Sequence, residues 1–454
     1  MKKTLAMILA ILMMLSMLTG CGGAETPAAT PAATQAQAEA PAAPEAKPFE
    51  GVTLNVLDVS HVPSAVIQEN LGEFEEMTGM KVNLEIEEYA SANTKKEIEL
   101  SGGSDAYDVM HTDTSLVNRY ATAGWAEDLT PYIEASEGYQ YDDFYASASQ
   151  GLVVNDAIYG VPTTWASSVM FYRADIFEAL NLEVPGTPDE LLAVCEAIAA
   201  SDYDIAPIVM RTRAGQGNNV QIWLHLAYAM GGGIFNEDET ALQLNSEASV
   251  KALEMYKTLI NDYAPAGFTD ATYTDSWTAF AQGQAAMLIE DQACTGFFQD
   301  PEKAVAEVID HWDCAPIFGE VDQMPHPAFS HGLMINVNSK QKEAAWAFIE
   351  WYTNIENQAR VAEAGYVATS RATSRATEAY AAIVGPAHVG ETSEAIAEYA
   401  TIFFRPVYLT EWTYIGDTIG TALQEVIVGA DAQATMDKMQ ADMTAFFTQE
   451  GYIG

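Results

Sequence analysis

The folded part of the chain opens with a regular alternation of apolar and polar residues. Residues 52–60 read VTLNVLDVS, and this two-residue period is typical of a β-strand. A helical pattern follows over residues 64–77, Thr78-Gly79 ends it, and KVNLEIEEY then alternates again. A strand, a helix and a second strand of these lengths predict a β-α-β unit with parallel strands and a right-handed crossover.

Polar side chains follow the predicted strands of this part of the chain. Ser60 and His61 come directly after the first strand, and Asp113 and Ser115 follow a short buried strand that begins at Tyr107. In open α/β sheets, ligands bind beyond the carboxyl ends of the strands. We therefore expect these four residues to contact a ligand, with the Asp113 carboxylate accepting from two hydroxyls; surface solvation or helix capping are the alternatives for Asp113.

Helical and strand patterns continue to the end of the chain. Helices are predicted over residues 218–230 and 246–263, strands at AAMLIED and HGLMINVN, and mainly helices from Glu343 onward. The folded part, roughly 405 residues, is longer than one ordinary domain. The sequence therefore predicts an α/β protein with two lobes.

The first 21 residues carry an export signal. Lys2 and Lys3 precede an uncharged apolar run of about 15 residues, which is shorter than the roughly 20 that a spanning helix needs. The run ends in Leu-Thr-Gly-Cys, which resembles the bacterial lipobox, so Cys21 is expected to carry a diacylglyceryl group. The alternative is an ordinary signal peptide with a chance cysteine. The following residues 22–48 are mostly Ala, Pro, Thr, Glu and Gln, and we interpret them as a disordered tether.

Charge and cysteine content narrow the set of partners. The formal net charge of -44 excludes nucleic acid as a partner, since few basic groups are available to replace phosphate counterions. The same charge repels an anionic membrane surface, so attachment would depend on the lipid alone, and it argues mildly against an anionic ligand. Besides Cys21 only three cysteines remain, so at most one disulfide can form. We expect a monomer.

Catalytic and metal-binding motifs are missing from the sequence. There is no G-x-S-x-G, H-E-x-x-H or C-x-x-C motif and no phosphate-binding glycine loop. The seven histidines lack metal-ligand spacing, and the acidic turn at 236–240 lacks the glycine of a calcium loop. We expect no enzyme activity, no cofactor and no metal. A surface glycosidase is the alternative from another class, and an adhesin is a third, although no residues select a catalytic pair and no repeats are present.

Several segments, in order and over nearly all of residues 50–454, resemble one family: the extracellular solute-binding proteins of carbohydrate ABC importers, with a maltose-binding-protein-like fold. They are FEEMTGMKVNLEI (74–86), RYATAGWAEDLTPYI (119–133), IYGVPTTWASSVMFYRADIFEALNL (158–182), WTAFAQGQAAMLIED (277–291), HGLMINVNSKQKEAAWAFIEWYTN (331–354) and GYVATSRA (365–372). The resemblance implies a two-lobed, type II periplasmic-binding-protein-like α/β fold with the ligand cleft between the lobes. It also implies a sugar or sugar alcohol as ligand and the membrane permease as partner. An oligosaccharide, a glycerol phosphate derivative or a peptide remain alternatives.

The resemblance also implies domain limits and further crossings between the lobes. These limits are 1–20 for the signal peptide, 21–49 for the lipidated cysteine and tether, 50–160 and 330–395 for the first lobe, and 161–329 and 396–454 for the second lobe.

Two tryptophans are the ligand-stacking rings that the resemblance implies. Trp165 follows the crossing motif G-V-P-T-T, and Trp412 lies near the C-terminus where sugar-binding members present an aromatic ring. A buried hinge residue and a helix-core residue are the respective alternatives. Trp223, in contrast, has the pattern of a core residue.

Other polar and aromatic residues are placed in the cleft on the same ground. Asp291 ends the AAMLIED strand, and Phe329 and His331 lie at the second crossing. Tyr366 and Arg371, in GYVATSR, are expected to donate hydrogen bonds to the ligand. His331 has a hinge role as its alternative, and Arg371 could instead pair with a carboxylate.

Overall fold

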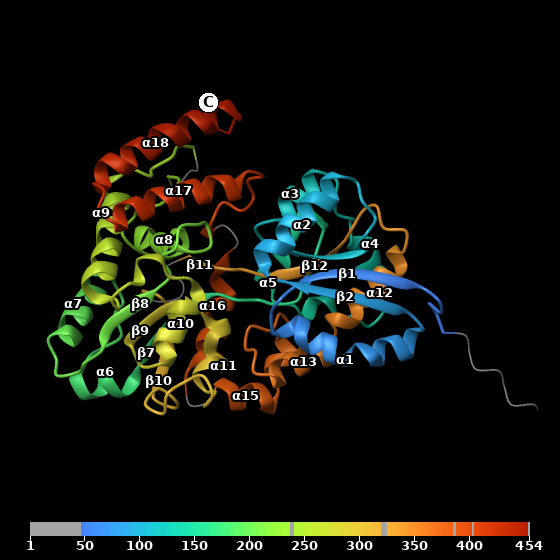
Figure 1. The fold of residues 1–454 in the computed structure, drawn as a ribbon, viewed down its shortest axis with the longest axis horizontal. Helices are drawn as coiled ribbons and strands as arrows, with labels where there is room; N and C mark the ends of the chain where they lie inside the picture. Colours follow the sequence, from blue (N-terminus) through green and yellow to red (C-terminus); the bar gives the residue numbers. More distant parts are fainter. Residues whose placement is uncertain (1–46, 237–239, 319–324, 385–386, 402–403, 453–454) are drawn as a thin grey trace, which may run out of the picture. The chain divides into compact units, whose positions relative to one another are not determined.

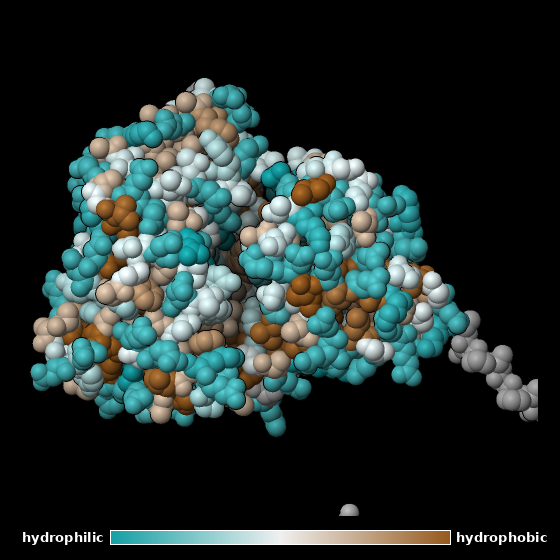
Figure 2. All heavy atoms as spheres, in the orientation of Figure 1, coloured by the Kyte–Doolittle hydropathy of each residue, from teal (hydrophilic) through white to brown (hydrophobic). Residues whose placement is uncertain are grey.

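The computed structural model describes residues 47–236, 240–318, 325–384, 387–401 and 404–452. Two sheets organise this part of the chain (Figure 1): a five-stranded sheet in the order β2-β1-β3-β12-β6 and a four-stranded sheet in the order β10-β7-β9-β8. Hydrophilic side chains cover most of the face drawn in Figure 2, as expected for a chain of net charge -44.

The five-stranded sheet begins with the predicted β-α-β unit. β1 (Thr53–Val59) lies parallel to β2 (Lys81–Glu87), and α1 (Val62–Thr78) connects them. β3 (Val109–Asp113) follows α2 (Tyr89–Ser101) and pairs parallel to β1. This confirms the predicted parallel unit.

Two antiparallel strands complete this sheet. β12 (His331–Ile335) pairs antiparallel with β3, and β6 (Val161–Pro162) pairs with the other edge of β12. In this register His331 lies opposite Asp113, and Leu333 lies opposite His111. The start of β12 is therefore adjacent to the carboxyl end of β3.

The four-stranded sheet brings a second set of strand ends together. β8 (Ala206–Met210) and β9 (Ala285–Asp291) run parallel, so their carboxyl ends lie at the same edge. β7 (Ser168–Arg173) is antiparallel to β9, with Ser168 opposite Asp291, and its other neighbour is β10 (Trp312–Ala315).

The remaining elements surround the two sheets. The helices are α3 (Val117–Thr122), α4 (Thr130–Ala135), α5 (Ala146–Gln150), α6 (Ala174–Leu180), α7 (Pro188–Ala199), α8 (Asn219–Ala229), α9 (Glu247–Thr258), α10 (Tyr273–Ala281), α11 (Thr295–Phe298), α12 (Lys342–Tyr352), α13 (Ile355–Glu363), α14 (Ala372–Arg375), α15 (Glu378–Val384), α16 (Val389–Tyr399), α17 (Trp412–Ile427) and α18 (Ala432–Gln449). Short helical turns are η1 (Tyr141–Asp143), η2 (Leu259–Tyr263), η3 (Phe268–Asp270) and η4 (Gln292–Cys294). The short strands are β4 (Val153–Val154), β5 (Ala157–Ile158), β11 (His326–Pro327) and β13 (Ala400–Thr401).

Each sheet has its own apolar core. Leu54, Val109 and Leu333 of the five-stranded sheet pack with Phe348 of α12. The four-stranded sheet packs against α8, and α8 contacts both α9 and α17, so Trp223 is a buried core residue as expected. Burial of these large side chains is the main term that stabilises the two layers.

The chain passes between the sheets more than once. It leaves the five-stranded sheet after β6, enters the four-stranded sheet at β7 and returns at β12. α12 contacts β12, whereas α16 contacts β10 of the other sheet. The predicted limits assign residues up to 395 to the first lobe, and they stay a prediction.

Two further findings concern membrane spans and thiols. Within the described ranges, no helix has both the length and the apolar character that crossing a bilayer requires. Cys195, Cys294 and Cys314 are buried free thiols.

A close contact between α17 and the loop before α8 gives a stability prediction. A Cβ atom on Gly420 would lie 2.4 Å from the backbone nitrogen of Gly215. Because backbone atoms cannot move aside without shifting the loop, we expect Gly420→Ala to lower the free energy of unfolding by about 1 to 3 kcal/mol. The matched control is Gly72→Ala in α1, where nothing lies within 4 Å, and it should stabilise the chain by about 0.5 to 1 kcal/mol. Urea unfolding measures both; a Gly420→Ala variant as stable as the parent would contradict the packing.

Candidate ligand-binding site

The Asp113 carboxylate stands at the carboxyl end of β3. Tyr89 donates its hydroxyl hydrogen to Oδ2 at 2.7 Å, and the backbone N–H of Ser115 donates to Oδ1 at 2.7 Å. Asp113 has no exposed surface, and this burial raises its pKa, an effect that the nearby positive charge of Lys96 opposes. The hydrogen bonds leave lone pairs on the carboxylate oxygens, so Asp113 can still accept from a ligand.

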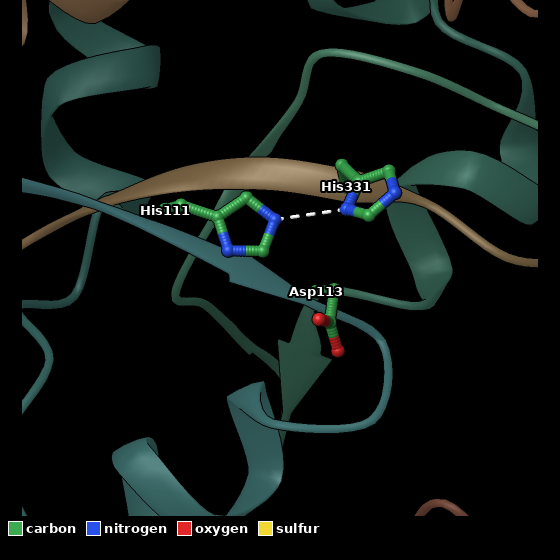
Figure 3. A group of neighbouring side chains, drawn as sticks. All are labelled: His111, Asp113 and His331. Atoms are coloured by element: carbon green, nitrogen blue, oxygen red, sulfur yellow. Dashed lines mark hydrogen bonds between the residues drawn. The ribbon is translucent and has the colours of Figure 1, made fainter. Parts of the chain in front are cut away.

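Two histidines lie beside this carboxylate, and a third contacts one of them. His111 Nε2 and His331 Nδ1 lie 2.8 Å apart, and Figure 3 shows the two rings above Asp113. The His61 ring lies edge-on to His331, with centroids 5.5 Å apart, and the Phe329 ring does the same at 5.0 Å. The predicted residues His61, Asp113, Phe329 and His331 are thus brought together.

His61 has one structural nitrogen and one that is unpaired. Its Nδ1 accepts from the backbone N–H of Ser64 at 3.2 Å and so caps α1. Its Nε2 is buried and has no hydrogen-bond partner among the described residues. Burial lowers the pKa of His61, so the ring is neutral at pH 7. Because Nδ1 accepts from the backbone, the proton is on Nε2, which can donate a hydrogen bond.

A second group of polar side chains lies at the carboxyl end of β9. Asp291 accepts from the backbone N–H of Ala293 at 3.0 Å, and burial raises its pKa to about 6. The neighbouring Glu290 is fully buried in an ion pair with Arg211, at 2.8 Å from Nε to Oε2. The negative charge of Asp291 raises the pKa of Tyr366, although burial of the phenol is the larger cause. Asp291 and Tyr366, both predicted, therefore lie near each other.

Arg405 connects the two groups electrostatically. Its guanidinium is buried, and the charge acts on both Asp113 and Asp291. Burial lowers the pKa of Arg405 to about 10, and the positive charge of Arg211 adds to this effect. Arg405 donates to Gln216 Oε1 at 2.8 Å and lies over the Phe329 ring, 5.6 Å from its centroid. The strand ends of both sheets therefore face one buried cation.

Unpaired polar atoms accompany these charges. Buried side-chain atoms without a hydrogen-bond partner in the described part of the chain include Thr114 Oγ1, Ser115 Oγ, Ser167 Oγ, Gln292 Nε2 and Ser330 Oγ. Backbone bonds join four of these five residues in pairs: Thr114 N–H donates to Ser330 O, and Gln292 N–H donates to Ser167 O. Because buried polar groups are normally paired, these atoms are free to bind a ligand that carries hydroxyls.

Two predicted residues, Trp165 and Arg371, are covered by protein groups in this structure. Trp165 has no exposed surface, because the Tyr145 ring and the Arg375 guanidinium cover it at 5.1 and 5.0 Å. Arg371 is likewise fully buried; it donates to the backbone carbonyls of residues 353, 140 and 139 and packs over the Phe144 ring. Both side chains are thus packed against protein groups in this structure, while Trp165 Nε1 has no hydrogen-bond partner among the described residues. The ligand-stacking role of Trp165 and the ligand-donor role of Arg371 stay predictions.

Trp412 and Ser60 were also predicted to contact the ligand, and these roles stay predictions. Trp412 is the first residue of α17, has no exposed surface, and donates from Nε1 to Gln216 Oε1 at 2.8 Å. Gln216 Oε1 also accepts from Arg405, so Trp412 helps to hold the side chain that binds Arg405. Ser60 is exposed, and its backbone N–H donates to Glu87 O at 2.7 Å.

Four site residues were missed by the sequence analysis: Tyr89, Lys96, His111 and Arg405. For Arg405 a signal existed, because the chain has only 20 basic residues and this one lies in the apolar run FFRPVY. For His111 the signal was a titratable residue in the middle of a buried strand. Tyr89 and Lys96 lie on a helix whose burial the sequence does not reveal.

His111, Asp113 and His331 also satisfy the distances of a metal site, with ligand atoms within 4.8 Å of one another. The histidine spacing in the sequence gave no sign of this group. The Lys96 ammonium, however, lies 3.0 Å from His111 Nδ1. A fixed positive charge at this distance repels a cation, so we assign no metal here. The turn at 236–240 includes residues outside the described ranges.

A family profile described as bacterial extracellular solute-binding protein matches residues 59–359. The match covers more than half of the chain, and the chain therefore belongs to this family. It is a solute-binding protein that acts outside the cytoplasm, in a family of binding proteins and not of enzymes.

Similar proteins share its fold and length. The erythritol/L-threitol-binding protein of Mycolicibacterium smegmatis is 22% identical over 429 residues, which cover 87% of this chain and 86% of that protein. A solute-binding protein of Agrobacterium radiobacter, solved with ribitol, is 26% identical, with a TM-score of 0.79 over 88% of this chain and 100% of that one. A protein of Agrobacterium vitis, solved with D-mannitol, is 22% identical, with a TM-score of 0.76 over 88% and 99%. The predicted two-lobed fold is confirmed.

Asp291 gives a prediction with a definite pH dependence. Its pKa is raised to about 6 from an ordinary 3.8, so the folded protein binds this proton more readily than the unfolded chain. The ionised carboxylate therefore costs stability above pH 6, and the cost disappears as the pH falls below 4. Asp291→Asn should raise the free energy of unfolding by about 1 to 2 kcal/mol at pH 7, and the gain should shrink on acidification.

Asp275→Asn is the matched control with the opposite sign. The Thr272 hydrogen bonds lower the pKa of Asp275, so its carboxylate stabilises the fold at pH 7. Urea unfolding of both variants at pH 7 and 4.5 provides the comparison. A loss of stability in Asp291→Asn at pH 7 would show that the carboxylate is not strained by burial.

Proposed function

We propose that this protein binds a sugar or sugar alcohol outside the cytoplasmic membrane and delivers it to the transmembrane subunits of an ABC importer. The observation that carries the proposal is the buried Arg405 guanidinium facing the Asp113 and Asp291 carboxylates beside unpaired hydroxyl groups. Each hydroxyl of a polyol can donate to a carboxylate and accept from a guanidinium, so a polyhydroxylated ligand suits this mixture of groups.

The charge balance of the site favours a neutral ligand. Arg211 and Glu290 neutralise each other in their ion pair. The remaining cations are balanced by buried carboxylates, since Asp113 and Asp291 act on Arg405, and Asp113 and Asp58 act on Lys96. A phosphorylated or carboxylated ligand would meet no unmatched cation here, which argues against a glycerol phosphate derivative.

Relatives support the same ligand class. Of the proteins compared above, one is an erythritol/L-threitol-binding protein and two were solved with ribitol and D-mannitol, all of them linear polyols. A further relative, the mannitol-binding protein of Pseudomonas aeruginosa, is 27% identical over 247 residues, which cover 53% of this chain and 56% of that protein. We further propose that the protein is not an enzyme and acts as a monomer, with no cofactor.

Replacing the central cation tests this function. Arg405→Met should weaken binding of the preferred polyol by at least 2 kcal/mol, since the ligand loses charged hydrogen-bond donors in a buried site. Arg213→Met, which removes a half-exposed arginine paired with Asp270, should bind normally. Titration calorimetry with erythritol, ribitol, mannitol, glucose and maltose gives the affinities. Unchanged affinity in Arg405→Met would remove Arg405 from the site, and conversion of any ligand to product would favour a glycosidase.

We also propose that lipidated Cys21 anchors the protein to the outer face of the membrane through the tether at 21–49. Cys21 lies outside the described residues, and the proposal depends on the Leu-Thr-Gly-Cys sequence. Cys21→Ser should move the protein from the membrane fraction to the medium or periplasm, as measured by fractionation and immunoblotting. A Cys21→Ser variant that stays in the membrane fraction would disprove the lipid anchor.

A further inference from the structure

A continuous row of hydrogen-bonding side chains leads from α2 through β3 to β12. Lys96 of α2 has no exposed surface; its Nζ donates to the backbone carbonyl of His111 at 2.8 Å and lies 3.0 Å from His111 Nδ1. His111 Nε2 then lies 2.8 Å from His331 Nδ1. Every nitrogen in the row except His331 Nε2 is thereby engaged within the protein.

The lysine determines which way the hydrogen bonds run. Burial lowers the pKa of Lys96 to about 8, with Asp113, Asp58 and Glu97 opposing this effect, so the ammonium is charged at pH 7. An ammonium group has only donors, so His111 Nδ1 must accept. Burial and the Lys96 charge also lower the pKa of His111 well below its ordinary value, so the ring is neutral.

The protonation of His111 determines the tautomer of His331. A neutral His111 that accepts at Nδ1 carries its proton on Nε2 and therefore donates to His331 Nδ1. Burial lowers the pKa of His331 as well. A neutral His331 that accepts at Nδ1 has its only N–H at Nε2, and Figure 3 shows this nitrogen on the side of the ring away from His111.

We propose that Lys96 and His111 are positioning residues that fix His331 as a hydrogen-bond donor to the ligand. One ring nitrogen of His331 lies within 4.8 Å of an Asp113 carboxylate oxygen, so the two side chains are neighbours, and the site offers the ligand a donor at His331 Nε2 and an acceptor at the Asp113 carboxylate. A hydroxyl group accepts from the first and donates to the second, whereas a carbonyl or ether oxygen can use only the donor. Lys96, His111 and His331 thus favour a ligand with a free hydroxyl at this position. This preference for a hydroxyl rests on the proposed function.

The tautomer is tested without any ligand. In long-range proton–nitrogen correlation spectra of the full-length protein labelled with 15N-histidine, the two neutral tautomers and the imidazolium give different cross-peak patterns. His331→Gln and His111→Gln identify the two rings. We expect both rings to be neutral with the proton on Nε2 at pH 7. An Nδ1–H tautomer or an imidazolium at His331 in the parent protein would overturn the proposal, whatever the ligand is.

A charge-removing pair of variants tests the role of the lysine. Lys96→Met keeps the length of the side chain and removes the donor, so His331 should populate both tautomers, and the affinity for the bound polyol should fall about tenfold. Lys95→Met removes the neighbouring charge, which pairs with Glu87 on the surface, and should leave both the spectrum and the affinity unchanged. If His331 keeps a single Nε2–H tautomer in Lys96→Met, the lysine does not set it.

Discussion

A buried guanidinium dominates the electrostatics of this protein. Arg405 is buried, so its guanidinium is removed from water. The Asp113 and Asp291 carboxylates, which lie at the strand ends of two different sheets, offset part of this cost. The desolvation cost of each group is reduced by the others, so none of them is stable in this position alone. The charges that link the two sheets are therefore the same groups that the proposed ligand would bind.

This arrangement places functional constraints on residues that do not touch the ligand. Gln216 accepts from both Arg405 and Trp412, and the loop that carries it fits against α17 only because Gly416 and Gly420 lack side chains. On the other sheet, Lys96 and His111 hold His331 in place. The site therefore depends on packing that extends well beyond its polar groups, and part of the folding free energy is used to keep charges buried.

The sequence was sufficient for the fold and for part of the site. Alternation and helical periodicity located β1, α1 and β2, because one face of each is buried against a core. Asp113 was expected from its position after a strand, whereas Asp291 and His331 were expected from the family resemblance. The ligand roles of Trp165, Arg371 and Trp412 stay predictions, because an aromatic ring or a guanidinium near a crossing can be covered by protein as readily as by a ligand. Burial depends on contacts such as Tyr145 with Trp165 and Gln140 with Arg371, which are distant or irregular in sequence. Arg405 and Lys96 were missed for the same reason, since only the tertiary structure reveals that they are buried.

A crystal structure of the protein with ribitol tests the central claim most directly. The account predicts one polyol molecule with hydroxyls hydrogen-bonded to Asp113, Asp291 and Arg405, and with His331 Nε2 within hydrogen-bond distance of a hydroxyl. A polyol bound elsewhere, or one that leaves Arg405 bonded only to Gln216 and the carboxylates unbound, would contradict it.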